Sequence, residues 1–245
     1  MEYVELIKET VHIKDSISIK ILKYFSIQHI QSAALFARHA YSIEKNYDGV
    51  FSDELFSHHS SYVTGSILSS VFFLEATINE LFADTVESNS KIVQKLNQAT
   101  IQLMAKMWKL GVPRTANFKI LQKYQIALGL AQNKIFDPGA SPYQDVNLLV
   151  KLRNDLVHYE PESVKSPSSD DFGAGDIHRY EKMLRGKFLA NPLTGQGNPF
   201  YPDKCLGHGC AEWAVNSSVK FVDAFFSRMG LVSPYDHVRD RLNTK

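Results

Sequence analysis

A long stretch of helical periodicity, residues 53–88, constrains the fold of this 245-residue chain more than any other feature. Its apolar residues recur at alternating spacings of four and three, which place them on one face of an α-helix: Ile67, Val71, Leu74, Ile78 and Leu81. A helix of that length reaches roughly 50 Å at 1.5 Å per residue. We therefore expect it to span the whole domain, with Gly65 and the serines around it permitting a close helix approach or a bend.

Shorter helices are predicted on both sides of this one, over residues 16–46, 91–110, 115–133, 141–160, 176–189 and 210–229. Thr115 is a candidate N-cap, and Ser141, Pro142 and Gln144 have the pattern of a capping box with proline at the first helical position. Residues 1–15 are predicted to form a short strand or an extended arm.

Two segments in the C-terminal third carry loop composition instead. Residues 163–175 are rich in serine, proline, aspartate and glycine, and residues 191–209 contain three prolines and four glycines. A loop as long as the second is uncommon inside a compact domain and is usually functional or mobile. The chain is thus predicted to be a single all-α domain over residues 1–245, an up-and-down helical bundle with a core at 16–160 and a loop-plus-helix elaboration at 161–245.

Charge and composition exclude several classes of protein. The formal net charge is +1, which argues against a domain that grips nucleic acid by bulk electrostatics, although a local basic patch remains compatible with it. The N-terminal residues lack the basic start and apolar core of a signal peptide. No apolar run approaches the ~18 residues that a membrane span needs. We therefore expect a cytoplasmic, soluble protein that does not bind a membrane.

The helix at 141–160 carries an unusual arginine. On a helical wheel its leucines and valines form one broad apolar arc, and Arg153 falls inside that arc. A charge directed into an apolar face must be paired, because an uncompensated buried charge costs several kcal/mol. Glu75 and Asn79, four apart on the long helix, are the expected partners. A purely structural salt bridge between helices explains the same pattern without any chemistry.

A family resemblance enters at Arg153-Asn154-Asp155-Leu156-Val157-His158. An arginine, a polar residue and then a histidine resemble the motif of the HEPN superfamily, in which four to six residues separate the arginine from the histidine; here four do. The placement late in an all-helical bundle is similar as well. The resemblance covers residues 16–160, and Glu75 would match the polar or acidic residue that the family often carries on an earlier helix.

The resemblance implies a metal-independent endoribonuclease that acts as a homodimer, in a toxin or defence role with RNA as substrate and an antitoxin as a further partner. The catalytic residues would be Arg153, Asn154 and His158, supported by Glu75 and Asn79. The chemistry suits these residue types: histidine exchanges protons near neutral pH, and arginine offers a permanently charged fork of donors to a phosphate. On an ideal helix Arg153 and His158 diverge by about 140°, so they would converge only in a dimer or where the helix ends.

Other patterns in the sequence carry weaker hypotheses. Cys205, His208 and Cys210 offer three metal ligands, with His178 as a fourth, but a glycine-rich turn with reduced cysteines explains them as well. Basic and aromatic residues cluster in the middle of the chain and would contact a phosphate backbone or form a solvated face: Lys106, Trp108, Lys109, Arg114, Lys119, Lys123 and Tyr124. No phosphate-cradling glycine motif is present, so no cofactor is expected. A non-catalytic helical interaction or RNA-binding module remains the alternative function.

Overall fold

The computed structural model describes residues 23–50, 52–87, 90, 92–114, 118–159 and 178–245, and within these residues the chain is all-α with no strand. The long helices are α1 (Phe25–Lys45), α2 (Asp53–Asp84) and α7 (His208–Met229). The shorter ones are α3 (Gln98–Lys109), α4 (Ile120–Leu130), α5 (Tyr143–Val157) and α6 (Arg179–Leu184), and the helical turns are η2 (Val112–Arg114), η3 (Phe200–Lys204) and η4 (Asp236–Leu242). The all-α prediction is confirmed, and the expected strand or arm at residues 1–15 lies outside the described residues.

The predicted helices are present, but several begin or end elsewhere. The third helix starts at Gln98 and not at residue 91, with Asn97 as an N-cap whose side chain accepts from the backbone N–H of Thr100. The candidate cap Thr115 lies outside the described residues, and α4 begins only at Ile120. The predicted capping box at Ser141 is wrong, because Pro142 occupies the N-cap position of α5 and no side chain caps that end.

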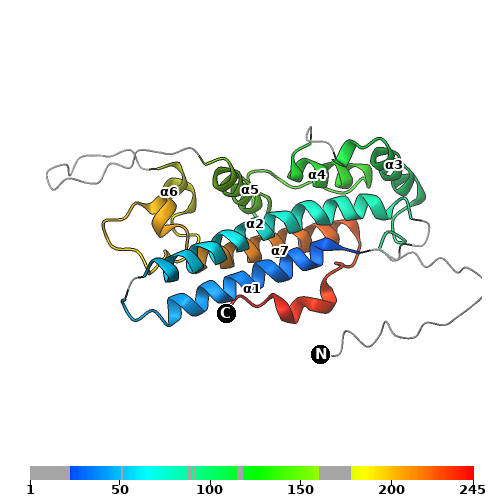
Figure 1. Cartoon of the computed structure of the whole chain (residues 1–245). Helices are drawn as coiled ribbons and strands as arrows, with labels where there is room; N and C mark the ends of the chain where they lie inside the picture. The colour runs from blue at the N-terminus through cyan, green and yellow to red at the C-terminus, as the bar shows by residue number, and fades with distance from the viewer. Residues whose placement is uncertain (1–22, 51, 88–89, 91, 115–117, 160–177) are drawn as a thin grey trace, which may run out of the picture.

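Helices α1 and α2 form a tightly packed antiparallel pair (Figure 1). Most of the residues that α1 buries are small, and four of them are alanines. The side chain of Ser66 donates to the carbonyl of Ala33 at 2.9 Å, and a Cβ on Gly65 would lie 3.0 Å from the Phe36 ring. The prediction that the serine-rich part of the long helix permits close approach is therefore confirmed.

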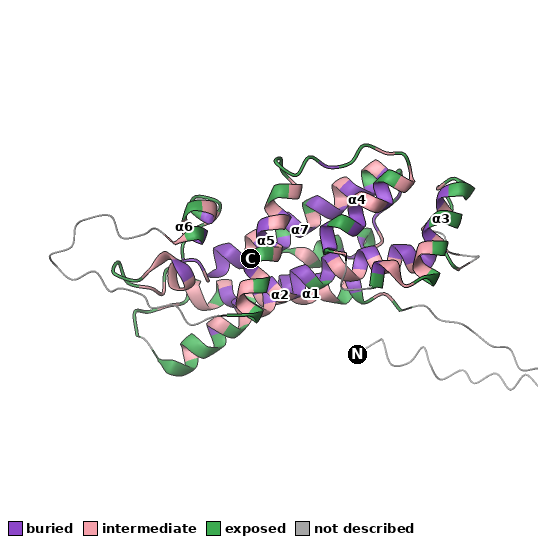
Figure 2. Ribbon diagram, turned by 90° about the horizontal axis from the view of Figure 1, so that it is seen from above, coloured by how far each residue is buried: buried purple, intermediate pink, exposed green. Residues whose placement is uncertain are grey.

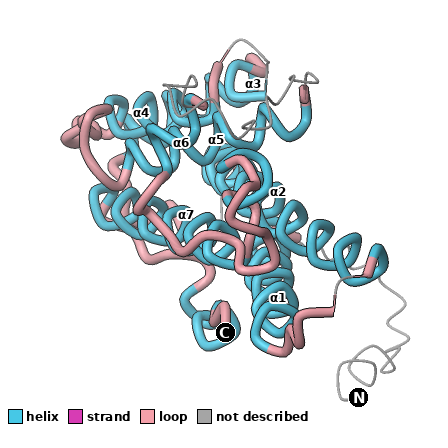
Figure 3. Tube along the Cα trace, turned by 90° about the vertical axis from the view of Figure 1, so that its left-hand side faces the viewer, coloured by secondary structure: helices cyan, strands magenta, loops and turns pink. Residues whose placement is uncertain are grey.

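Helix α7 lies beside α1 and α2 and completes a three-helix core (Figure 3). Its first residue, His208, meets Glu44 near the end of α1, and its Ser218 hydroxyl donates to the carbonyl of Ser70 in α2. The side chains along its inner face are fully buried in the same apolar cluster as those of α1 and α2. In Figure 2 the buried surface follows the contacts among these three helices. The C-terminal region thus contributes directly to the core.

Helix α2 has the length and the apolar composition of a membrane-spanning segment, contrary to the expectation from sequence. An 18-residue window in it has a mean hydropathy of 1.3, and 61% of that window is buried inside the protein. A helix at the centre of a soluble bundle meets the same criterion, because it is apolar on most of its circumference. The property is explained by the packing of α2 against α1, α5 and α7.

The proline- and glycine-rich stretch at 191–209 is held in place by one buried side chain. Asn191 is 5% exposed, and its amide nitrogen donates to the carbonyls of Asp203 and Leu206, which lie 12 and 15 residues further along. Its side-chain oxygen accepts from the backbone N–H of Leu193. Within this stretch Phe200–Lys204 forms a π-helical turn. The long loop is therefore an internally bonded unit that leads directly into α7.

Candidate functional site

Helix α5 lies over α2, between α4 and α6 in Figure 1, and presents the arginine–histidine motif at its C-terminal end. Its apolar side, including Val146, Leu149 and Leu152, is fully buried against α2 and α7. Arg153, which the helical wheel places inside the apolar arc, is only half-buried, whereas Asn154 and His158 are exposed. The motif thus combines one half-buried arginine with two exposed polar side chains.

Arg153 makes no hydrogen bond or ion pair with the residues that the structure describes. Its Nε atom is enclosed by protein and lacks an acceptor. Buried donors normally have partners, since leaving one unsatisfied costs about 1–3 kcal/mol. The guanidinium is therefore able to donate to an acceptor other than the described residues.

His158 lies at the point where the helix ends. It is the C-cap residue of α5, with φ −112° and ψ 42°, and its backbone N–H donates to the carbonyl of Asn154 at 2.8 Å. The backbone leaves the helical path at this residue, so the 140° divergence of an ideal helix does not govern its side chain. The exposed apolar residues Val157 (52%) and Tyr159 (49%) lie on either side of it in sequence.

Asp155, inside the motif, has a structural partner that the sequence pattern did not indicate. Its carboxylate pairs with Arg179 at the start of α6. Burial and the neighbouring Asp155 carboxylate also raise the pKa of Tyr180, the next residue on α6. These contacts fix α6 beside the C-terminal half of α5. The middle of the motif therefore has a structural role, whatever its ends do.

The predicted contact between Glu75 and Arg153 is wrong. The Glu75 carboxylate binds Lys123 of α4 instead, with Nζ and Oε1 2.9 Å apart, and Asn79 accepts from the same ammonium group at 3.3 Å. Lys123 is 3% exposed, so the acidic partner serves a lysine that the fold has buried. Glu75 and Asn79 thus lie on the same face of α2, as their spacing predicts. That face contacts α4 and not the arginine–histidine motif.

The expected basic patch in the middle of the chain is also corrected. Lys123 is buried, and Tyr124 is fully buried with its hydroxyl donating to the Leu74 carbonyl at 2.6 Å. Arg114 lies over the Trp108 ring, 4.7 Å from its centroid. Two members of the proposed phosphate-binding set therefore belong to the core, and what remains on the surface is a short cluster at the end of α3.

Cys205 and Cys210 are both free thiols with no exposed surface. Burial, together with a hydrogen bond to Cys205, raises the pKa of the Cys210 thiol well above its ordinary value. His208 is held by other groups, since its Nε2 lies 3.1 Å from the Thr244 carbonyl oxygen. Among the described residues no group of three or more His, Cys, Asp and Glu side chains is arranged to hold a metal ion. The geometry fits two reduced structural cysteines.

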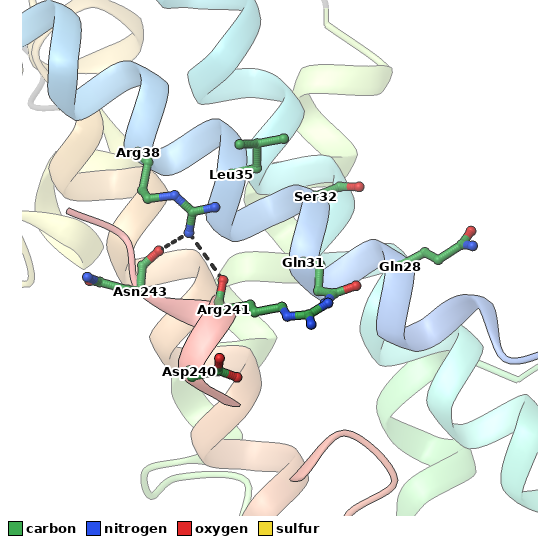
Figure 4. A pocket seen from close by; sticks show the side chains of 8 residues that line it. All are labelled: Gln28, Gln31, Ser32, Leu35, Arg38, Asp240, Arg241 and Asn243. Atoms are coloured by element: carbon green, nitrogen blue, oxygen red, sulfur yellow. Dashed lines mark hydrogen bonds between the residues drawn. The ribbon is translucent and has the colours of Figure 1, made fainter. Parts of the chain in front are cut away.

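A shallow recess between α1 and the C-terminal turn has a different character (Figure 4). Arg38 reaches from α1 to the carbonyl of Arg241 at 3.2 Å and to the carbonyl of Asn243. Its guanidinium therefore ties the end of the chain to the core. The recess lies on the solvent side of this contact between α1 and the C-terminal turn.

Comparison with known proteins identifies no relative. No protein-family model matches the chain, and neither a curated protein nor a solved structure is significantly similar to it.

Proposed function

We propose that this protein is a metal-independent endoribonuclease of HEPN type that acts as a homodimer, with RNA as its substrate. The observation that carries the proposal is the state of Arg153: its Nε atom is buried and has no acceptor among the described residues, and an exposed histidine lies five residues further along. A phosphate oxygen is the acceptor that such a fork of donors fits best. A cytoplasmic location and a toxin or defence role with an antitoxin partner belong to the same proposal.

The proposed chemistry uses three residues of α5. His158 takes the proton from a ribose 2′-hydroxyl, and the 2′-oxygen attacks the adjacent phosphorus while the bond to the 5′-oxygen breaks. Arg153 offsets the charge that gathers on the phosphate oxygens, and the Asn154 amide supplies a further donor. A second imidazole, the partner subunit's His158, returns a proton to the leaving 5′-oxygen. The products are a 2′,3′-cyclic phosphate and a 5′-hydroxyl.

Two features of α5 support a composite site in a dimer. The helix ends at Val157, so His158 is released from the helical face of its neighbours. The exposed side chains of Val157 and Tyr159 adjoin the polar pair, and apolar side chains exposed beside polar ones are typical of protein interfaces. In this proposal Glu75 and Asn79 act at a distance, by fixing α4 on α2, and do not touch the substrate.

The test is cleavage of a mixed RNA pool in excess EDTA by the wild-type protein and by His158→Ala. His58→Ala is the matched control, since His58 is an exposed histidine on α2. The proposal expects cyclic-phosphate ends with the wild type and with His58→Ala, and a loss of at least about 100-fold with His158→Ala, the scale of general acid–base catalysis. Absence of cleavage by the folded wild type would overturn it.

A non-catalytic interaction module is the second candidate, and the same exposed apolar pair favours it. In that case Arg153 would donate to a carbonyl or carboxylate of a partner protein, and His158 would need no proton exchange. Pull-down or sedimentation with Arg153→Gln then separates the two functions, because a module loses its partner with this variant whereas a nuclease loses phosphate binding and keeps its oligomeric state.

A further inference from the structure

A groove at the opposite end of α5 from the motif is enclosed by three separate parts of the chain. It has a volume of about 810 Å³ and lies between the end of α1, the first turns of α7 and the segment at 187–192. An ion pair of 2.8 Å between Lys187 and Asp145 fixes this segment to the first turn of α5. We call this the α1–α7 groove, after the two long helices that line it.

The walls of the α1–α7 groove are aromatic. Tyr41 comes from α1, Phe188 from the segment before the long loop, and Trp213 from α7. Phe188 and Trp213 pack on each other with centroids 5.6 Å apart, and Tyr41 packs on the ring of His208 at 4.9 Å. The rings are therefore fixed in place without a ligand, which is the state of a pre-formed pocket.

The carboxylates in the groove are already engaged by hydrogen bonds within the protein. Glu44 accepts from the His208 backbone N–H at 2.5 Å and lies 2.8 Å from Nε2 of His59. Burial tends to raise the pKa of Glu212, but hydrogen bonds from Lys245 and Thr244 outweigh it and hold that pKa below its ordinary value. Both acids are thus committed to internal contacts.

One cation in the groove, Lys45, has no ion-pair partner among the described residues. Lys45 is exposed at the end of α1 and contacts the Tyr41 ring, 5.7 Å from its centroid, without an ion pair among the described residues. Lys187 and Lys245, by contrast, pair with Asp145 and Glu212. The groove therefore combines fixed aromatic walls with a lysine at its rim that has no ion pair among the described residues.

The long loop explains why the groove keeps its shape. Asn191 ties the loop to itself, and the backbone oxygen of Leu189 lies so close to α7 that a Cβ on Gly209 would be 2.3 Å from it. A loop of this length with its own hydrogen-bond network is more often functional than incidental. The segment at 187–192, which leads into this loop, forms the third wall of the groove.

We infer that the α1–α7 groove binds a small planar aromatic compound that carries one anionic group, with the ring against Tyr41 and Trp213 and the anion at Lys45. A nucleoside monophosphate and an aromatic carboxylate share this chemistry. The inference is independent of the proposed nuclease, since its residues lie outside Arg153, Asn154 and His158.

The tryptophans allow a direct measurement. The chain has two, and Trp108 lies beneath Arg114 at the end of α3. In Trp108→Phe the remaining fluorescence, excited at 295 nm, reports on Trp213 alone. The probes are adenosine 5′-monophosphate, nicotinate, adenosine (a ring without charge) and inorganic phosphate (a charge without a ring). The inference expects saturable quenching by at least one of the two anionic aromatic probes, at least tenfold tighter than by adenosine or phosphate.

Variants in the same background test the location. Lys45→Gln should weaken binding about tenfold, because a charge-assisted contact is lost, whereas Lys151→Gln, an exposed lysine on α5, should leave it unchanged. Asn216→Phe, at an exposed position of α7 that lines the groove, should fill the space and abolish binding. His158→Ala should bind normally even if it cleaves no RNA. Absence of saturable quenching by either anionic aromatic probe, or equal binding by Lys45→Gln, would overturn the inference.

Discussion

The ammonium group of Lys123 lies 2.9 Å from the Glu75 carboxylate, yet the lysine side chain is 3% exposed and the glutamate side chain is 43% exposed. The pair thus joins a buried cation on α4 to an anion that reaches solvent from α2. Asn79 supplies a second acceptor at 3.3 Å, one helical turn further along. The contact fixes α4 on the long helix and satisfies a charge that the fold has buried.

Removing the two partners should have unequal effects. Glu75→Gln leaves an uncompensated ammonium in the interior and should lower the free energy of unfolding by about 1–3 kcal/mol. Lys123→Met removes the charge and nearly conserves the volume, so it should cost less, as replaced buried ion pairs often do. Urea denaturation measures both, with Lys151→Met as an exposed control expected to change by under about 0.5 kcal/mol. A larger loss with Lys123→Met would contradict this account.

This contact also marks the limit of what the sequence predicts. Periodicity places Glu75 and Asn79 on one face of the long helix, and both contact the same lysine. It also places Arg153 inside an apolar arc, and in the structure this residue is only half-buried. Periodicity gives the angular position of a residue on its own helix, but it does not tell which neighbouring helix lies opposite that residue. The pairing of Glu75 with Lys123 depends on how α4 is shifted along α2, which is a property of the packed core.

The same reasoning explains the other differences. Lys119 and Lys123 are four apart and are predicted to lie on a solvated or phosphate-binding face, but Lys123 and Tyr124 are buried because α4 packs against both α2 and α7. The role of Asn191 was not predictable either, since its partners Asp203 and Leu206 lie beyond any local turn pattern. The catalytic role of Arg153, Asn154 and His158 stays a prediction.

Asp84 should make stability depend on pH. Burial, helped by the negative charge of Glu87, raises the pKa of this carboxyl despite the hydrogen bond of 2.8 Å that Tyr24 donates to it. The folded chain therefore holds the proton at pH values where the unfolded chain has released it. The contribution of Asp84 to stability is consequently greatest below the ordinary pKa near 4 and declines as pH rises through the folded pKa.

Asp84→Asn keeps an acceptor for Tyr24 and removes the titration. We expect its Tm to exceed that of the wild type at pH 8 by roughly 2–4 °C, the shift that ~1 kcal/mol gives in a chain of this size. The difference should vanish at about pH 4. Thermal unfolding followed by circular dichroism from pH 4 to 8 measures it, and the exposed Asp240→Asn serves as control. A pH-independent difference would show that packing and not titration is responsible.

The two thiols should be inert in the native protein. Cys205 and Cys210 have no exposed surface, and the raised pKa of Cys210 disfavours its thiolate, which is the reactive form. An aromatic disulfide reagent at pH 8 should therefore label neither residue until urea unfolds the chain, after which two thiols per chain should react. Ser57→Cys, an exposed position on α2, is the positive control and should react at once. Rapid labelling of the native wild type would mean that the loop at 191–209 opens readily.

Gly209 should tolerate no side chain, for a reason of space and not of backbone conformation. It lies within helix α7, yet a Cβ there would meet the Leu189 carbonyl oxygen at 2.3 Å and the Leu189 nitrogen at 3.0 Å. Both are backbone atoms and cannot rotate away, so Gly209→Ala should lower the free energy of unfolding by about 1–3 kcal/mol, the cost of overpacking. Gly129→Ala is the matched control, because Gly129 is exposed within α4 and has open space at its Cβ position. It should gain roughly 0.5–1 kcal/mol from the higher helix propensity of alanine. Urea denaturation measures the two opposite changes in the free energy of unfolding.

In the Trp108→Phe background Gly209→Ala should also shift the Trp213 emission maximum, since the displaced segment carries Phe188. A loss of stability without that shift would mean that α7 yields and the wall of the α1–α7 groove does not.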